Sequence, residues 1–186
     1  MKYDPDKHHR RSIRLPGYDY SRSGAYFVTI CTQNRECMFG KIVGGEMVLN
    51  DAGRMINIVW DEMQGNYPGV ETDEFVVMPN HTHGIIVLVG AGPRTCPDNG
   101  QPKNNGHPQG VAPTLSLPDV VHRFKTMTTK RYTDGVKQSG WAPYPGKLWQ
   151  RNYYEHIIRN EQELNKIREY IVNNPFNWQS DENYSE

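Results

Sequence analysis

Two histidines, His81 and His83, stand one residue apart within a stretch rich in β-branched residues. The apolar runs on either side, residues 75–77 and 85–89, are too short and too branched for a comfortable helix. In a strand, side chains alternate between faces, so both imidazoles point one way and Thr82 points the other. Neutral imidazole nitrogens are common ligands of divalent metals. The pair is a candidate metal site, and the alternative is two ordinary polar residues where a strand begins.

A tyrosine and an asparagine near the C-terminus form a second candidate group. Asn160, with a glutamate three residues later, resembles a capping box, and we expect a helix from about 161 to 173. Tyr170 and Asn174 are four residues apart and therefore near one face of that helix. Pro175 ends the helix, and we expect it to push Asn174 out of helical geometry.

Two further tyrosines, Tyr153 and Tyr154, stand earlier in the chain. They lie in residues 148–159, a block dense in aromatic and charged residues in which we find no regular spacing. Adjacent tyrosines commonly pack or stack on bases, whereas a well-capped helix positions a reactive group accurately. Of the three tyrosines, Tyr170 is therefore the one expected on a rigid element.

Strands and helices around these groups follow from local patterns. Residues 25–32 predict a central strand, a turn follows, and residues 37–43 run back from it. Gly44 and Gly45 predict a hairpin that leads into another strand at residues 46–49. Asn50 or Asp51 caps a helix that ends before Gly65, and Ser116 begins a second helix. The expected buried stripes of these helices are Met55, Ile56, Val59, Trp60 and Met63 in the first, and Val120, Val121, Phe124, Met127 and Thr128 in the second.

The charge is balanced overall but uneven along the chain. The 186 residues fit one domain and carry 21 Lys+Arg against 21 Asp+Glu. Residues 120–159 hold eight basic and two acidic residues, whereas acids exceed bases six to two from Asn160 onward. Such asymmetry suggests a polyanion-binding face beside an acidic tail, although a solvated surface explains it equally well.

Two segments differ in character from the rest. An N-terminal arm, residues 1–24, interleaves basic residues with Tyr18 and Tyr20, which suits phosphate and base contacts; a loosely packed arm is the alternative. Residues 91–113 are rich in glycine and proline without periodicity, and we expect a long flexible surface loop there.

The cysteines and the apolar runs exclude two classes of protein. Cys31, Cys37 and Cys96 are an odd number without metal-type spacing, so no disulfide framework is indicated. No apolar run approaches 18 residues and the N-terminus does not resemble a signal peptide. We expect a soluble, cytoplasmic protein without a membrane partner.

Four blocks of sequence together resemble the REP-associated tyrosine transposases, which are single-tyrosine HUH transposases. They are GAYFVT at 24–29, MPNHTHG at 78–84, WQRNYYEHIIR at 149–159 and YIVNNP at 170–175, in the family's order. The resemblance implies an α+β fold with a central, mainly antiparallel sheet flanked by helices, of the HUH endonuclease or ferredoxin-like type. It covers the chain as one domain.

The same resemblance implies roles for particular residues. His81 and His83 correspond to ligands of Mg²⁺ or Mn²⁺, Tyr170 to the nucleophile, and Asn174 to a third ligand. Tyr153 and Tyr154 are the competing candidates for the nucleophile, and the expected helix favours Tyr170. There are two departures from the family: Thr82 replaces a bulky apolar residue, and the simpler insertion-sequence relatives carry glutamine where Asn174 stands. The implied substrate is single-stranded DNA folded into a hairpin by an imperfect palindrome, with the tyrosine retaining the 5′ end and a 3′-hydroxyl set free.

This chemistry is coherent because a metal on two histidines can polarise a phosphodiester and orient it for attack. Candidate residues for gripping the DNA phosphates are Arg10, Arg11, Arg14, Arg123, Lys125, Lys130, Arg131 and Arg151. Two other functions stay open: a non-cleaving protein that binds hairpin nucleic acid, and a small metal phosphodiesterase with a water nucleophile. The sequence is compatible with a monomer or a homodimer.

Overall fold

The computed structural model describes residues 15, 17–89 and 115–185. An antiparallel four-stranded sheet lies at its centre, in the order β4-β5-β1-β6. Its strands are β1 (Gly24–Cys31), β4 (Val70–Val77), β5 (His81–Leu88) and β6 (Tyr154–Ile158). The expected α+β fold is confirmed, and the strand predicted at residues 25–32 is one of the two central strands.

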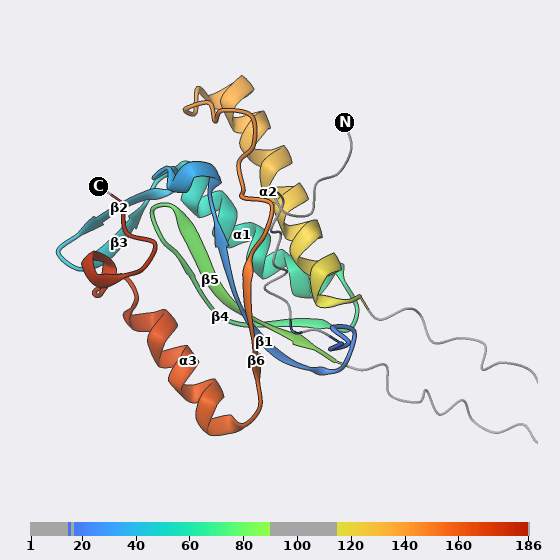
Figure 1. Ribbon diagram of the computed structural model, residues 1–186. Helices are drawn as coiled ribbons and strands as arrows, with labels where there is room; N and C mark the ends of the chain where they lie inside the picture. Colours follow the sequence, from blue (N-terminus) through green and yellow to red (C-terminus); the bar gives the residue numbers. More distant parts are fainter. Residues whose placement is uncertain (1–14, 16, 90–114, 186) are drawn as a thin grey trace, which may run out of the picture.

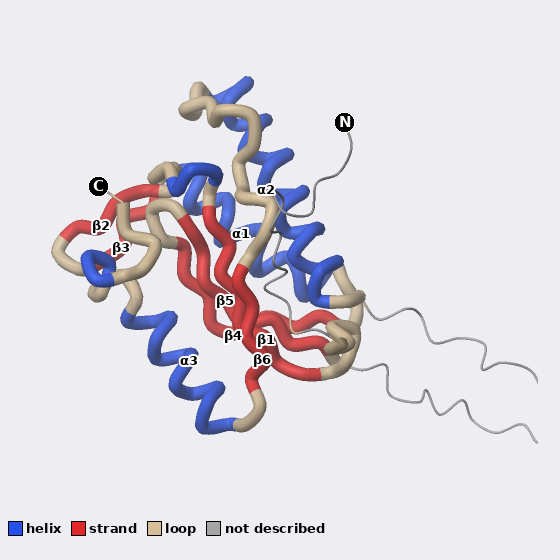
Figure 2. The backbone as a smooth tube through the Cα atoms, viewed as in Figure 1, coloured by secondary structure: helices blue, strands red, loops and turns tan. Residues whose placement is uncertain are grey.

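Helices cover both faces of this sheet (Figure 1). Helices α1 (Asp51–Asn66) and α2 (Leu117–Ser139) pack together on one face, and α3 (Glu161–Asn173) lies on the other. Alternation along β1 divides the core accordingly. Val28 belongs to the large hydrophobic cluster that includes residues of α1 and α2. Phe27 packs in a smaller cluster with Ile85 of β5 and Ile171 of α3. The sheet thus separates two helical layers, and Figure 2 shows the strands running between them.

The first two helices form as their caps predict. The side chain of Asn50 accepts a hydrogen bond from the Gly53 amide at 2.9 Å, and Ser116 and Asp119 form a capping box. Their apolar stripes are buried as expected, with Met55 and Met127 only partly covered. One boundary prediction was wrong: α1 continues through Gly65 to Asn66.

Two strand predictions need correction. Of residues 37–43, only β2 (Gly40–Val43) is a strand, and it pairs with β3 (Glu46–Leu49) in a separate two-stranded sheet. It cannot return along β1 because β5 and β6 occupy both edges of that strand. The turn between β2 and β3 is the predicted Gly44–Gly45 pair, both with positive φ. Strand β6 lies in the block where no regular element was expected.

The described end of the N-terminal arm belongs to the core. The Tyr20 side chain is buried, its ring centroid lies 4.9 Å from that of Tyr18, and the Tyr18 hydroxyl lies 3.3 Å from that of Tyr26. Tyr20 is therefore a packing residue and not a platform for bases. The arm up to residue 14 and the predicted loop at 91–113 lie outside the described residues. No helix in the described ranges is both long and apolar enough to cross a membrane.

Gly84 provides a test of this packing. A Cβ atom there would lie 2.6 Å from Cη2 of Trp60 and 2.8 Å from Cδ2 of Phe75, two stacked rings that cannot both retreat. We expect Gly84→Ala to lower the free energy of unfolding by roughly 1–3 kcal/mol, measured by denaturant titration. Gly65→Ala is the control, since a Cβ in that helical position meets nothing within 4 Å. Equal stability of both variants would contradict this account.

Candidate active site

Strand β5 presents both histidines on the face covered by α3. His81 and His83 are fully buried, and their Nε2 atoms lie 2.9 Å apart. Each ring is fixed through its other nitrogen: His81 Nδ1 lies 2.8 Å from Asn80 Oδ1, and His83 Nδ1 lies 2.8 Å from Thr29 Oγ1. Such bonds fix the orientation of metal-ligating histidines and leave Nε2 facing the ligand. The expectation that both imidazoles share one strand face is confirmed.

Burial keeps both imidazoles neutral. It lowers the pKa of His81 to about 3, and the neighbouring His83 lowers it further while Asp181 opposes the shift. Burial also lowers the pKa of His83, against the opposing hydrogen bond and charge of Asp181. The neutral form is the one that ligates metals.

Asp181 completes this group and was not found from the sequence. Its side chain is 2% exposed, and its Oδ2 atom lies 3.8 Å from His83 Nε2. One ligand atom from each of His81, His83 and Asp181 falls within 4.8 Å of the others. Burial raises the pKa of Asp181, but hydrogen bonds from His83, Asn174 and the Asn183 amide outweigh it, so the net pKa lies below its usual range. The carboxylate is therefore ionised beside two neutral imidazoles.

Asn174 lies on this site although its predicted geometry was wrong. Its φ of −59° and ψ of −41° are helical, despite the following proline. Its Nδ2 donates to Asp181 Oδ2 at 2.9 Å, while its Oδ1 is buried and accepts no hydrogen bond from the described residues. An orphaned buried oxygen is costly unless another group binds it.

The chemistry of these donors fits a divalent metal. Two imidazole nitrogens and a carboxylate oxygen lie together, and Asn174, whose amide oxygen is unsatisfied, is bonded to that carboxylate. Mixed nitrogen and oxygen ligands suit Mn²⁺ and related ions, and oxygen ligands suit Mg²⁺. The residues present therefore fit such an ion.

Tyr170 reaches the same group from α3. Its hydroxyl lies 3.4 Å from both His83 Nε2 and Asp181 Oδ2, and its ring centroid lies 5.3 Å from that of His83. Burial and the charge of Asp181 raise the pKa of Tyr170 to about 12, so the phenol is protonated near neutral pH. The residue is nonetheless 46% exposed, which leaves it open to a large substrate.

Tyr154 shares this face more closely than the sequence suggested. It is opposite Thr29 in the register of β6 and β1, it is 53% exposed, and its ring centroid lies 6.3 Å from that of Phe27. Together with Tyr153 it lines a cavity of about 440 Å³ that also contains Tyr170 and His83. The two tyrosines therefore border the site, whereas the Tyr170 hydroxyl lies within 3.4 Å of His83 and Asp181 atoms.

The predicted phosphate-gripping residues are scattered. Helix α2 lies across the sheet from α3 (Figure 1), so its cations do not surround Tyr170. Lys125 donates to the carbonyls of residues 150, 151 and 152, and burial lowers its pKa to about 8. Arg131 pairs with Glu62, and Arg123 covers the ring of Tyr67. Lys130 and Arg151 are exposed, while Arg10, Arg11 and Arg14 lie outside the described residues.

Comparison with known proteins agrees with this arrangement. The family model described as "Transposase IS200 like" matches residues 110–174, which include Tyr170. An uncharacterised protein of Haemophilus influenzae is 42% identical over 187 residues, 98% of this chain and 97% of that protein. A candidate REP-associated tyrosine transposase of the same species is 25% identical over 162 residues, covering 84% of this chain and 73% of that one.

A solved structure shares the fold. It is described as a REP-associated tyrosine transposase bound to a REP hairpin, and it aligns with a TM-score of 0.52 at 19% identity, over 87% of this chain and 72% of the other. The family match, the relatives and the shared fold agree with the resemblance carried by the four sequence blocks. The chain belongs to the IS200-like transposases, in the group that includes the REP-associated tyrosine transposases.

Proposed function

We propose that this protein is a metal-dependent endonuclease and strand transferase that acts on single-stranded DNA folded into a hairpin. Membership of a transposase family supports DNA as its partner. The solved relative bound to a REP hairpin supports a hairpin as the form of that DNA. The observation that carries the proposal is the Tyr170 hydroxyl, which lies 3.4 Å from an imidazole nitrogen of the buried histidine pair.

The metal would be held by His81 and His83 through Nε2, together with oxygens of Asn174 and Asp181. A bound Mg²⁺ or Mn²⁺ would polarise the non-bridging oxygens of the scissile phosphate and offset its negative charge. Asn80 and Thr29 hold the imidazoles at their Nδ1 atoms, so the ligands are orientated before an ion arrives.

Tyr170 would then form the covalent intermediate. Its oxygen attacks the phosphorus, the bond from phosphorus to the 3′-oxygen breaks, and the departing oxygen takes up a proton from water. The phenolic proton leaves to water on the exposed side of the ring, while Asp181 orients the hydroxyl. The products are a 5′-phosphotyrosine and a free 3′-hydroxyl. The bond energy is conserved, so a second 3′-hydroxyl can attack the phosphotyrosine and complete strand transfer.

The metal assignment predicts losses of both binding and cleavage. We expect His81→Ala and His83→Ala to abolish Mn²⁺ binding in calorimetric titrations, and Asp181→Asn to weaken it by about ten- to a hundredfold. His122→Ala is a matched control, because this exposed histidine lies on α2 away from the site. EDTA should stop cleavage of a hairpin oligonucleotide by the parent protein. Undiminished cleavage in EDTA, or by either histidine variant, would contradict the assignment.

The nucleophile assignment predicts a separation of binding from chemistry. Tyr170→Phe keeps the ring packed against Phe27 and His83 and removes only the hydroxyl. We expect no covalent protein–DNA adduct on denaturing gels, no cleavage, and nearly unchanged hairpin binding. Tyr154→Phe, on the same sheet face, is the control and should still form the adduct.

The same experiment distinguishes the two other functions. An adduct with Tyr170→Phe but none with Tyr154→Phe would move the chemistry to β6. Hairpin binding without cleavage by the parent protein, with or without metal, would indicate a binding protein only. Repeated turnover of small phosphodiesters without an adduct would indicate a hydrolase with a water nucleophile.

A further inference from the structure

Arg35 is a cation on the lining of the cavity that contains Tyr170 and His83. That cavity has a volume of about 440 Å³, and among the described residues that line it Arg35 is the one cation and Glu182 the one acid. His83 also lines it, but burial keeps its imidazole neutral by lowering its pKa. A guanidinium suits a phosphate because its planar fork can donate two parallel hydrogen bonds. Arg35 is therefore the lining residue whose charge and shape fit a DNA phosphate.

The backbone of Arg35 has an uncommon geometry. Asn34 and Arg35 both have a φ of 57°, and they are the two non-glycine residues with positive φ in the described part of the chain. Such geometry is costly for a residue with a Cβ atom, and it occurs most often at functional sites. Hydrogen bonds from Asn80 Nδ2 at 3.1 Å and from Ser185 Oγ at 3.0 Å hold the Arg35 carbonyl in place. Glycine would adopt this geometry without strain, so the turn itself does not explain an arginine at this position.

The guanidinium keeps most of its donors available. Its Nη1 atom donates to the carbonyl oxygen of Glu182 at 2.7 Å, and none of its other N–H groups binds an acceptor in the described residues. Arginine carries five such donors, so its free edge can still bind an anion. The charge also reaches the histidine pair. Burial is the main cause of the lowered pKa of His81, the charge of His83 is the next, and the charge of Arg35 adds to both.

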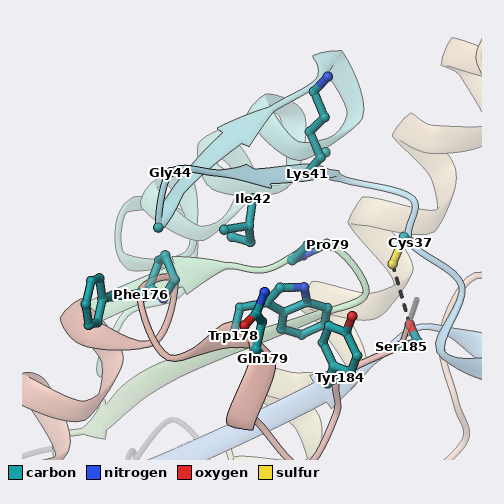
Figure 3. Close-up of a pocket in the computed structure, with 13 residues that line it drawn as sticks. Cys37, Lys41, Ile42, Gly44, Pro79, Phe176, Trp178, Gln179, Tyr184 and Ser185 are labelled. Atoms are coloured by element: carbon teal, nitrogen blue, oxygen red, sulfur yellow. Dashed lines mark hydrogen bonds between the residues drawn. The ribbon is translucent and has the colours of Figure 1, made fainter.

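The turn that carries Arg35 is tied to the segment that supplies Asp181. Cys37 Sγ lies 3.5 Å from Ser185 Oγ (Figure 3), and the same hydroxyl donates to the Arg35 carbonyl. The Asn80 side chain joins that carbonyl to the histidine pair. The guanidinium is thus held in a fixed position relative to the candidate metal ligands.

We propose that Arg35 binds the phosphodiester that Tyr170 attacks and offsets the negative charge on its non-bridging oxygens. The inference rests on the proposed function, because it takes that phosphodiester from the substrate of the site. A positive group that is already in position stabilises this charge in the transition state without having to reorganise. Arg35 supplies such a group from the protein itself, in addition to the charge of a metal ion.

The first test measures the salt dependence of hairpin binding in EDTA, where no cleavage occurs. The probe is a hairpin oligonucleotide with unpaired extensions at both ends, followed by fluorescence anisotropy between about 50 and 200 mM KCl. We expect Arg35→Gly, which suits the positive φ, to reduce the slope of log affinity against log salt by roughly 0.7, the loss of one phosphate contact on a single strand. Arg35→Lys keeps the charge and should keep the slope.

Arg54→Ala is the matched control. Arg54 is also exposed and also donates from Nη1 to a carbonyl at 2.7 Å, that of Leu49, but it lies on α1 outside the cavity. The slope of this variant should equal that of the parent protein.

The second test measures the rate of adduct formation with saturating hairpin and Mn²⁺. We expect Arg35→Gly to be slower by roughly 10²- to 10³-fold, and Arg35→Lys to lie between it and the parent, because an ammonium keeps the charge without the fork. Mn²⁺ affinity, measured by calorimetry, should stay unchanged in both variants. A parental salt slope in Arg35→Gly overturns the proposal, and so does a parental rate. A weakened Mn²⁺ affinity together with a parental slope would show that Arg35 only holds the segment of Asp181.

Failure of the proposed function gives a different result, namely no metal-dependent cleavage by the parent protein. The salt slopes are measured without cleavage, so they still decide whether Arg35 contacts a DNA phosphate.

Discussion

The register between β1 and β5 is the constraint on which the site depends. It pairs Thr29 with His83 and Cys31 with His81, so the hydroxyl that holds His83 stands directly opposite it. A slip by one residue would turn every side chain of β5 to the other face, carrying both imidazoles into the core under α1 and α2. That core fixes the register, because Ile86 and Leu88 are buried in it and Gly84 leaves room there for Trp60. Packing on one face thus positions the chemistry on the other.

The placement of α3 follows from contacts on both sides of Tyr170. Ile171, the next residue, is fully buried against Phe27 and Ile85. Arg168 donates through Nε to Asp73 at 2.9 Å, at the point where the pairing of β4 with β5 shifts register. Bulges of this kind commonly redirect a side chain beside an active site. The helix is therefore attached to the sheet within two residues of Tyr170, the proposed nucleophile, on either side of it.

Local sequence patterns were sufficient to predict the parts of the site that lie within a single strand or helix. The alternation of β5 placed His81 and His83 on one face, and the cap at Asn160 placed the helix that carries Tyr170. Strand β6 was not predicted because its buried residue is Glu155, so its sequence does not show an alternation of apolar residues. The helical geometry of Asn174 was not predicted, because its burial and its hydrogen bond to Asp181 outweigh the preference for extended geometry that Pro175 imposes on the residue before it.

Asp181 could not have been found in this way, since it depends on how the chain returns after α3. The turns after Asn174 bring the C-terminal segment back to the start of β5, where Asn80 binds it. The Oδ1 atom of Asn80 lies 2.8 Å from Nδ1 of His81. The Nδ2 atom of Asn80 donates to the carbonyl of Asn183 and to the hydroxyl of Ser185. One buried amide therefore couples the orientation of His81, a candidate metal ligand, to the position of the segment that supplies Asp181. Residues 181–185, which by composition belong to an acidic tail, structurally form a wall of the candidate active site.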